Sequence, residues 1–138
     1  MRVFFDASVI IASILSETGG SSKLLRYIQT GKFVGITSQT AVDEVLEKTQ
    51  KIKKSKNEIE SFIAESKLLV RKKITLEEIQ PYSGLVDIED AHLIAGAKLT
   101  GCTHLVSLDK KHILREDIQK KFLPLLIVSP KMLLEEIR

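Results

Sequence analysis

Short apolar runs alternate with longer stretches of helical periodicity along this 138-residue chain. Apolar runs that are rich in β-favouring residues and end at a polar residue predict buried strands. The predicted strands are residues 3–5, 33–36, 69–74, 103–108 and 125–128. Stretches that place apolar residues on one stripe predict helices. The predicted helices are residues 8–17, 21–31, 37–52, 57–69, 88–101 and 129–138. Residues 75–85 are rich in turn-forming residues and end the first part of the fold.

Capping residues mark several of the predicted helix ends. Ser21 or Ser22 suits the N-cap of the second helix, because a hydroxyl can accept a hydrogen bond from a free backbone N–H. Gly101 stops the helix at 88–101. Ser129 precedes Pro130, which is favoured at the first helical position, so the last helix is expected to begin there.

Alternation of short buried strands with helices is typical of an α/β protein in which helices cover both faces of a mainly parallel sheet. The pattern therefore predicts a three-layer α/β/α sandwich. A chain of 138 residues is long enough to bury its own core and has the size of one ordinary domain. We expect residues 1–138 to form a single domain.

Composition narrows the classes of function. Hydrophobic residues make up 43% of the chain and charged residues 28%, with no apolar run of about 18 residues that could span a membrane. The N-terminus places an acid inside its apolar stretch, which argues against a secretory signal, and the lone Cys102 fits a reducing cytoplasm. A net charge of +3 is compatible with a polyanionic partner. The absence of Trp argues that such contacts would involve phosphates more than stacked bases.

Several acids stand where a parallel sheet would gather them. Asp6 and Asp109 each directly follow a predicted strand, so both should emerge at the carboxyl edge of the sheet, where sites form in such folds. Asp90 lies in the first turn of a helix that can begin at the same edge. Glu44 lies about two turns into another helix and can lean over that edge.

A cluster of this kind needs a counter-charge. Like charges within a few ångströms raise one another's pKa values, so several ionised carboxylates cannot share one site unaided. Magnesium and manganese favour oxygen ligands and would supply the missing positive charge. Such an ion can activate water and neutralise charge on a phosphate. The residues therefore favour metal-assisted phosphodiester hydrolysis.

At these acids the chain resembles the PIN domain, a small metal-dependent ribonuclease fold. The resemblance runs over nearly the whole length. It rests on four segments in order, "VFFDASV", "TSQTAVDEVLEK", "DIEDAHLIAGAK" and "THLVSLDKK". The resemblance implies RNA cleavage with Mg2+ or Mn2+. Many stand-alone PIN domains of this length are toxins of toxin–antitoxin pairs, so a homodimer and a partner antitoxin are further implications.

The resemblance also assigns roles to individual residues. The implied catalytic acids are Asp6, Glu44, Asp90 and Asp109. All of these except the helix acid at position 44 would hold the ion. Ser8 and Ser107 match positions that order the site, and Asp87 stands where some relatives carry an extra acid. An activated water would attack the scissile phosphate in line and leave a 5′-phosphate product.

Some of these acids also have a purely local explanation. Asp87 as N-cap and Asp90 as the third helical residue suit a capping box at the positive end of a helix. Asp109 suits a turn. Asp6 is harder to explain locally, because a charge between two apolar runs is costly to bury without a partner.

Two further assignments stay open on the sequence. Glu44 alone reads as a solvated helix acid, and its neighbours Asp43 and Glu47 can take its place in the match. Lys110 and Lys111, beside the last acid, are candidate RNA contacts through phosphate, although a lysine cluster is ordinarily a solvated surface.

The histidines are interpreted as structural. His92 is expected on a different helix face from the acid two residues before it, and His104 and His112 show no zinc-type spacing with Cys102. Cys102 itself reads as a small buried residue.

Two other functions compete with the nuclease. The first is a non-catalytic module of the same fold that binds RNA or protein without cutting. The second is a receiver-type domain that accepts a phosphoryl group on an aspartate. Strand one offers only Asp6 where such a receiver needs an acidic pair, so the second alternative is disfavoured.

Overall fold

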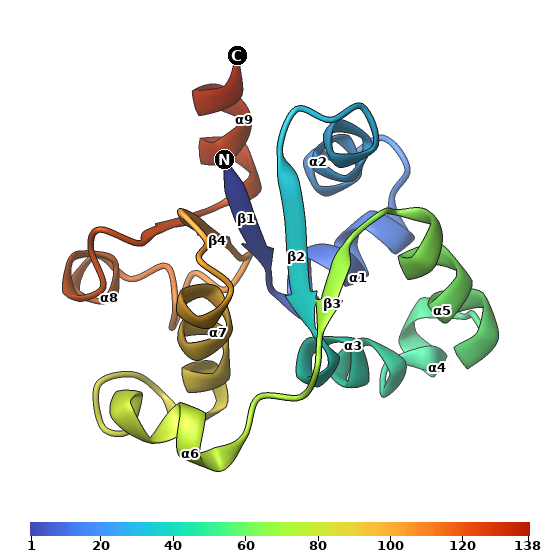
Figure 1. The fold of residues 1–138 in the computed structure, drawn as a ribbon. Coiled ribbons are helices and arrows are strands. Elements are labelled where there is room, and N and C mark those ends of the chain that lie inside the picture. Colours follow the sequence, from blue (N-terminus) through green and yellow to red (C-terminus); the bar gives the residue numbers. More distant parts are fainter.

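The computed structural model describes residues 1–138 and contains one sheet of five parallel strands (Figure 1). The strands are β1 (Arg2–Phe5), β2 (Val34–Ser38), β3 (Leu69–Arg71), β4 (His104–Val106) and β5 (Leu126–Val128). Their order across the sheet is β3-β2-β1-β4-β5, and every pairing is parallel. The chain therefore leaves the central strand β1 in one direction first and in the other later, which makes the end of β1 a topological switch point.

Helices connect the strands. They are α1 (Ala7–Leu15), α2 (Gly20–Gln29), α3 (Gln39–Leu46), α4 (Thr49–Ile52), α5 (Lys56–Glu65), α6 (Leu76–Ile79), α7 (Ile88–Leu99), α8 (Glu116–Lys121) and α9 (Pro130–Ile137), with a 3-10 turn at η1 (Gln80–Tyr82). None of these helices combines the length and the apolar character that a bilayer crossing requires.

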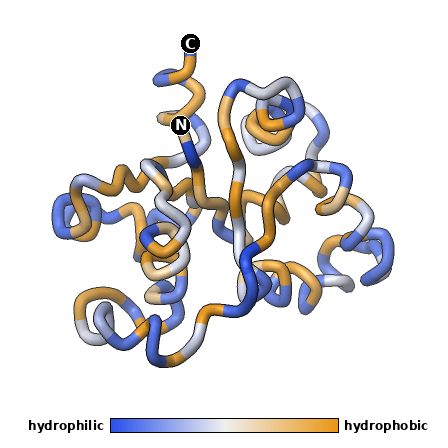
Figure 2. Tube along the Cα trace, in the orientation of Figure 1, coloured by the Kyte–Doolittle hydropathy of each residue, from blue (hydrophilic) through white to orange (hydrophobic).

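The central strand is buried on both faces of the sheet. Val3 and Phe5 point into a core shared with α1, α2, α3, α5 and α9, whereas Phe4 points into a second core shared with α7 and α8. All three side chains are fully buried. Figure 2 shows largely hydrophobic colours along the strands where the layers meet. The predicted α/β/α architecture is confirmed, with a wholly parallel sheet in place of the expected mainly parallel one.

The predicted helix at 37–52 is in fact two helices. Lys48 leaves the helical region, with φ −103° and ψ 24°, and separates α3 from α4. Val45 before the break and Ile52 after it are both buried in the same core. The two residues are seven positions apart, so they would also share one face of an unbroken helix, and their spacing gives no sign of the break.

The predicted serine cap of α2 is wrong. Gly19 is the N-cap, and Ser21 and Ser22 are buried inside the helix. The Ser22 hydroxyl donates to the carbonyl oxygens of Ser13 and Ser16, at the end of α1. The serine therefore satisfies the carbonyl end of the preceding helix instead of the amide end of its own.

Other predicted ends are confirmed, and two short elements are new. Ser129 accepts a hydrogen bond from Met132 N at 3.2 Å and caps α9. Gly101 follows α7 with φ +67°, a conformation that favours glycine. The sequence pattern missed α6 and α8, which are too short to show a clear helical period.

One glycine sets how closely α7 approaches the sheet. A Cβ atom on Gly96 would lie 2.5 Å from Cζ of Phe4, whose ring is fully buried and has no room to move aside. Glycine at this position therefore allows α7 to pack directly on the ring from β1. The position of the whole helix, including its N-terminal turn at the carboxyl edge, depends on this contact.

We expect Gly96→Ala to lower the free energy of unfolding by a net amount of about 1–2 kcal/mol, because overpacking outweighs the better helix propensity of alanine. Urea denaturation of the purified variant measures the loss. Phe4→Leu provides the control background, since a smaller side chain leaves space for the added methyl group. An equal loss in both backgrounds would contradict the proposed clash.

Candidate metal centre

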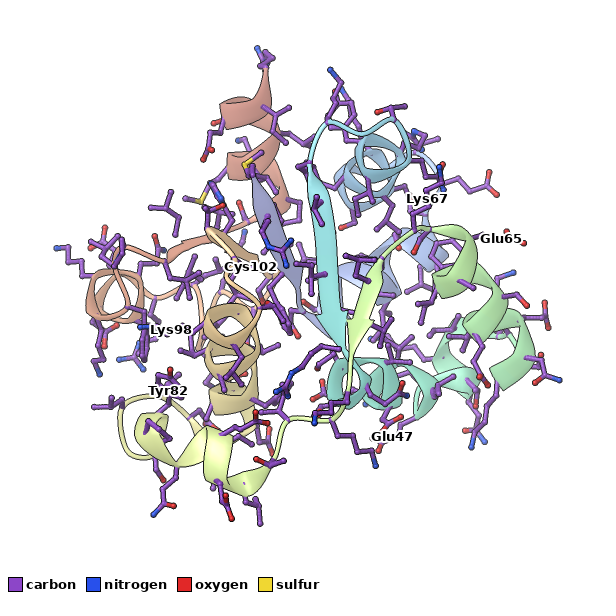
Figure 3. The ribbon with its side chains drawn as sticks, viewed as in Figure 1. Glu47, Glu65, Lys67, Tyr82, Lys98 and Cys102 are labelled. Atoms are coloured by element: carbon purple, nitrogen blue, oxygen red, sulfur yellow. The ribbon has the colours of Figure 1, made fainter.

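A cleft of about 770 Å³ opens at the carboxyl edge of the sheet. The acids that line it are Asp6, Glu44, Glu47, Glu89, Asp90 and Asp109. They come from the ends of β1 and β4, from α3 and from the first turn of α7. These segments meet at the edge toward which the strand arrows point in Figure 1. Figure 3 labels Glu47, which lies at the end of α3 on this side of the molecule.

Asp6 is the most deeply placed of these acids, at 8% exposure. Its backbone N–H donates to the carbonyl oxygen of Val106, and this bond continues the pairing of β1 with β4 past the end of the strand. Burial raises the pKa of Asp6, hydrogen bonds from Ser107 and Ser8 lower it, and the charge of Glu44 raises it. The net direction of the pKa is upward, because burial outweighs the two hydrogen bonds.

Two serine hydroxyls organise the floor of the cleft. Ser107 Oγ donates to Oδ2 of Asp6 at 2.7 Å, and Ser8 Oγ donates to the same oxygen at 3.0 Å. Each hydroxyl oxygen also accepts from the backbone beyond β4. Leu108 N donates to Ser8 at 3.1 Å, and Asp109 N donates to Ser107 at 3.1 Å. The network holds Asp6 beside Asp109, although the two lie far apart in the sequence.

Asp90 is half-buried, and the charges of neighbouring acids affect its pKa. Burial, together with the charges of Asp109, Asp6 and Asp87, raises its pKa to about 6, and His112 opposes the increase. The expected capping box at this helix is not formed, because Asp87 Oδ1 accepts from Glu89 N at 3.0 Å. Asp87 therefore caps α7 through the second helical residue, and Asp90 faces the cleft.

Asp109 combines both of its sequence interpretations. Its Oδ1 accepts from the backbone N–H groups of Lys111 and His112, each at 3.2 Å, so it orders the turn after β4. Its carboxylate also borders the cleft. One ligand atom each from Asp90, Asp109 and His112 lies within 4.8 Å of the others.

The structure thus brings His112 close to these two acids, which its spacing to Cys102 did not predict. Its Nδ1 lies 3.1 Å from Oδ2 of Asp109, and its side chain is 51% exposed. The turn after β4 reverses the chain and returns the imidazole to the acid three residues earlier. That turn was visible in the sequence only as the string "SLDKKH", whose Asp and following polar residues were a signal for it.

His92 also borders the cleft, although it lies on a different helix face from Asp90. Its Nε2 lies 2.8 Å from Oε1 of Glu44, and the residue lines the same cleft. The start of α7 lies at the sheet edge between the two helix layers, so more than one face of this helix borders the cleft. A helical wheel alone does not reveal that position.

The three acids of α3 separate in space. Asp43 pairs with Lys73 at 3.3 Å and accepts from Gln39 at 2.9 Å, outside the cleft. Glu44 and Glu47 both line the cleft. The structure therefore removes one of the two neighbours that the sequence left open for the helix acid.

The lysines beside the site are exposed. Lys110 and Lys111 follow the last acid and extend into solvent, and Lys48 lines the cleft itself. The acidic floor thus has basic residues at its rim.

Comparison with known proteins places this architecture in a family. The sequence pattern of the PIN domain matches residues 2–111, which contain every residue that lines the cleft. The chain belongs to the PIN domain family. No curated protein sequence matches it.

Two solved structures share the fold. The crystal structure of VapBC2 from Rickettsia felis, bound to a DNA fragment from their promoter, has a TM-score of 0.63 and 16% identity over 94% of this chain and 98% of that one. The crystal structure of VapC20 from Mycobacterium tuberculosis, a sarcin-ricin loop cleaving toxin, has a TM-score of 0.58 and 14% identity over 79% of this chain and 91% of that one. At these identities the likeness establishes the fold alone.

The donor set fits a divalent cation. Carboxylate oxygens suit Mg2+ and Mn2+, and an adjacent imidazole is compatible with transition metals. Burial first, and then the charges of the neighbouring acids, raise the pKa of Asp90. A bound cation would relieve the repulsion among these acids.

We expect Asp90→Asn to stabilise the metal-free protein near pH 7. The folded state raises the pKa of Asp90 from 3.8 to about 6, so between these values it binds more protons than the unfolded chain. Stability therefore falls as the pH rises through this window, and the full penalty is present above it. After discounting for solvent screening of a half-buried group, the gain is about 1–2 kcal/mol.

Urea unfolding measures this gain, which should vanish at a pH near the unfolded pKa of aspartate, roughly 4. Glu60→Gln is the control, because it removes an exposed charge from α5, outside the cleft lining. An equal gain in that variant would point to the general charge balance instead of repulsion inside the cleft.

Proposed function

We propose that this protein is a metal-dependent endoribonuclease that hydrolyses RNA phosphodiester bonds. The observation that carries the proposal is the convergence of Asp6, Asp90 and Asp109 at one cleft, with a raised pKa at Asp90. Membership of the PIN domain family supports it, since the matched residues 2–111 include all three of these acids.

The proposal gives each of these side chains a role. Asp6, Asp90 and Asp109 hold Mg2+ or Mn2+, while Ser8 and Ser107 keep the first of these carboxylates oriented. A bound ion of this kind stabilises charge on the phosphate and lowers the pKa of water. Glu44, across the cleft, orients the attacking water. Asp87 supports the arrangement by capping the helix that carries Asp90.

A partner protein is a further part of the proposal. The Rickettsia felis structure contains a VapBC pair, and the Mycobacterium tuberculosis protein is described as a toxin. By analogy, we infer that this chain acts as the toxin of a toxin–antitoxin pair, with an antitoxin that restrains it. A homodimer and a cytoplasmic location, where RNA is available, complete the proposal.

Asp6→Asn should lower the rate of Mn2+-dependent RNA cleavage at least about 100-fold, because the ion contributes several kcal/mol of charge stabilisation. Cleavage of a labelled single-stranded RNA, with end-group analysis for a 5′-phosphate, measures the effect. Asp43→Asn is the matched control, since Asp43 pairs with Lys73 outside the cleft. Isothermal titration with Mn2+ should give binding in the wild type and the control alone.

A non-catalytic module is the alternative that this experiment separates. RNA binding without cleavage in wild-type protein, and no Mn2+ uptake that depends on Asp6, would favour the module over the enzyme.

Lys110→Ala combined with Lys111→Ala should weaken RNA binding across all sequences. Each lost phosphate contact should reduce the slope of log affinity against log salt by about 0.7 for single-stranded RNA. Fluorescence anisotropy at several salt concentrations measures both quantities. Lys23→Ala is a control on α2, away from the cleft lining. Unchanged affinity and slope in the double variant would exclude these two lysines from the RNA path.

A further inference from the structure

His92 is almost fully buried, with 8% of its side chain exposed, and it occupies an unusual environment. Its Nε2 atom lies 2.8 Å from Oε1 of Glu44. Its Nδ1 atom is buried without any hydrogen-bond partner. The imidazole is therefore held between a carboxylate of the cleft on one side and a surface that offers it no polar contact on the other.

The contact joins two separate layers of the fold. α3, which carries Glu44, packs in the core on one face of the sheet. α7, which carries His92, packs in the core on the opposite face. The pair meets at the carboxyl edge, where both side chains line the acidic cleft.

A role in packing alone explains His92 poorly. A buried nitrogen without a partner lowers stability, and an apolar side chain of the same size would avoid that penalty. His104 shows the contrasting arrangement. Its Nδ1 lies 2.7 Å from Thr103 Oγ1, and its Nε2 lies 2.9 Å from Glu136, so both ring nitrogens have partners. Retention of an unsatisfied group is expected where function requires it.

Glu44 needs such a partner to hold one position. Its side chain is 43% exposed and has several rotatable bonds, so it would sample many conformers in solvent. A group that acts on a water molecule works best when its position is fixed before the substrate binds. His92 is placed to supply this constraint from the far side of the cleft.

We propose that His92 is a positioning residue that fixes the Glu44 carboxylate in the cleft, so that the two side chains act as one unit on the attacking water. This inference rests on the proposed nuclease function. It assigns the histidine no contact with RNA and no place among the metal-holding acids.

A double-mutant cycle tests whether His92 and Glu44 act together. His92→Phe keeps a ring of similar size and removes both nitrogens, and Glu44→Gln removes the charge that the histidine faces. Each single variant should lower kcat for RNA cleavage about 10-fold or more, with KM for RNA little changed. Because both changes disable the same unit, the double variant should be no slower than Glu44→Gln alone.

Two companion variants separate positioning from structure. His92→Gln can place an N–H donor near the original Nε2 position and should recover much of the lost kcat. His92→Phe should melt at the same temperature as the wild type or higher, because it removes the unpartnered nitrogen. His104→Phe should behave in the opposite way, with a lower melting temperature and unchanged cleavage per folded molecule.

The outcomes separate this inference from the function beneath it. Wild-type rates in His92→Phe, or losses that multiply in the double variant, would overturn the positioning role while the nuclease stands. A marked drop in the melting temperature of His92→Phe would also overturn it, by showing that the side chain serves the core. Wild-type protein that cuts no RNA would overturn the nuclease proposal and this inference together.

Discussion

Burial of the Asp6 carboxylate at the end of the central strand is the constraint from which the rest of the carboxyl edge follows. A buried carboxylate in that position requires hydrogen-bond donors, and the hydroxyls of Ser8 and Ser107 supply them. Those hydroxyls in turn accept from the backbone after β4 and fix the segment that carries Asp109. The demand of one buried oxygen thus organises two loops that are distant in sequence.

The parallel topology allows the fold to tolerate this concentration of negative charge. Every strand ends at the same edge, so the apolar cores on both faces of the sheet stabilise a structure whose repulsive groups are confined to one rim. Close packing of Gly96 on Phe4 sets the helix that brings Asp90 to that rim. Stability and chemistry therefore occupy different parts of a small molecule, as is common where sites form at strand ends.

The sequence pattern predicts those parts of the molecule that depend on local periodicity. Strand-ending acids such as Asp6 and Asp109 point to the edge because their position requires only a strand and a parallel sheet. The positions of His92 and His112 could not be predicted. They depend on where α7 lies between the two helix layers and on how the turn after β4 folds back. The break at Lys48 could not be predicted either, because the apolar positions before and after it keep one uninterrupted helical stripe.

The two edges of the sheet carry a different consequence. β3 and β5 are each three residues long, and β3 ends at Arg71, which forms an ion pair with Glu78. An unpaired strand edge is the usual template for fibril growth and for uncontrolled association between chains. Edges this short, one of them ended by a bound charge, give an incoming strand little to pair with. The two short edge strands therefore limit association between copies of the chain through the sheet.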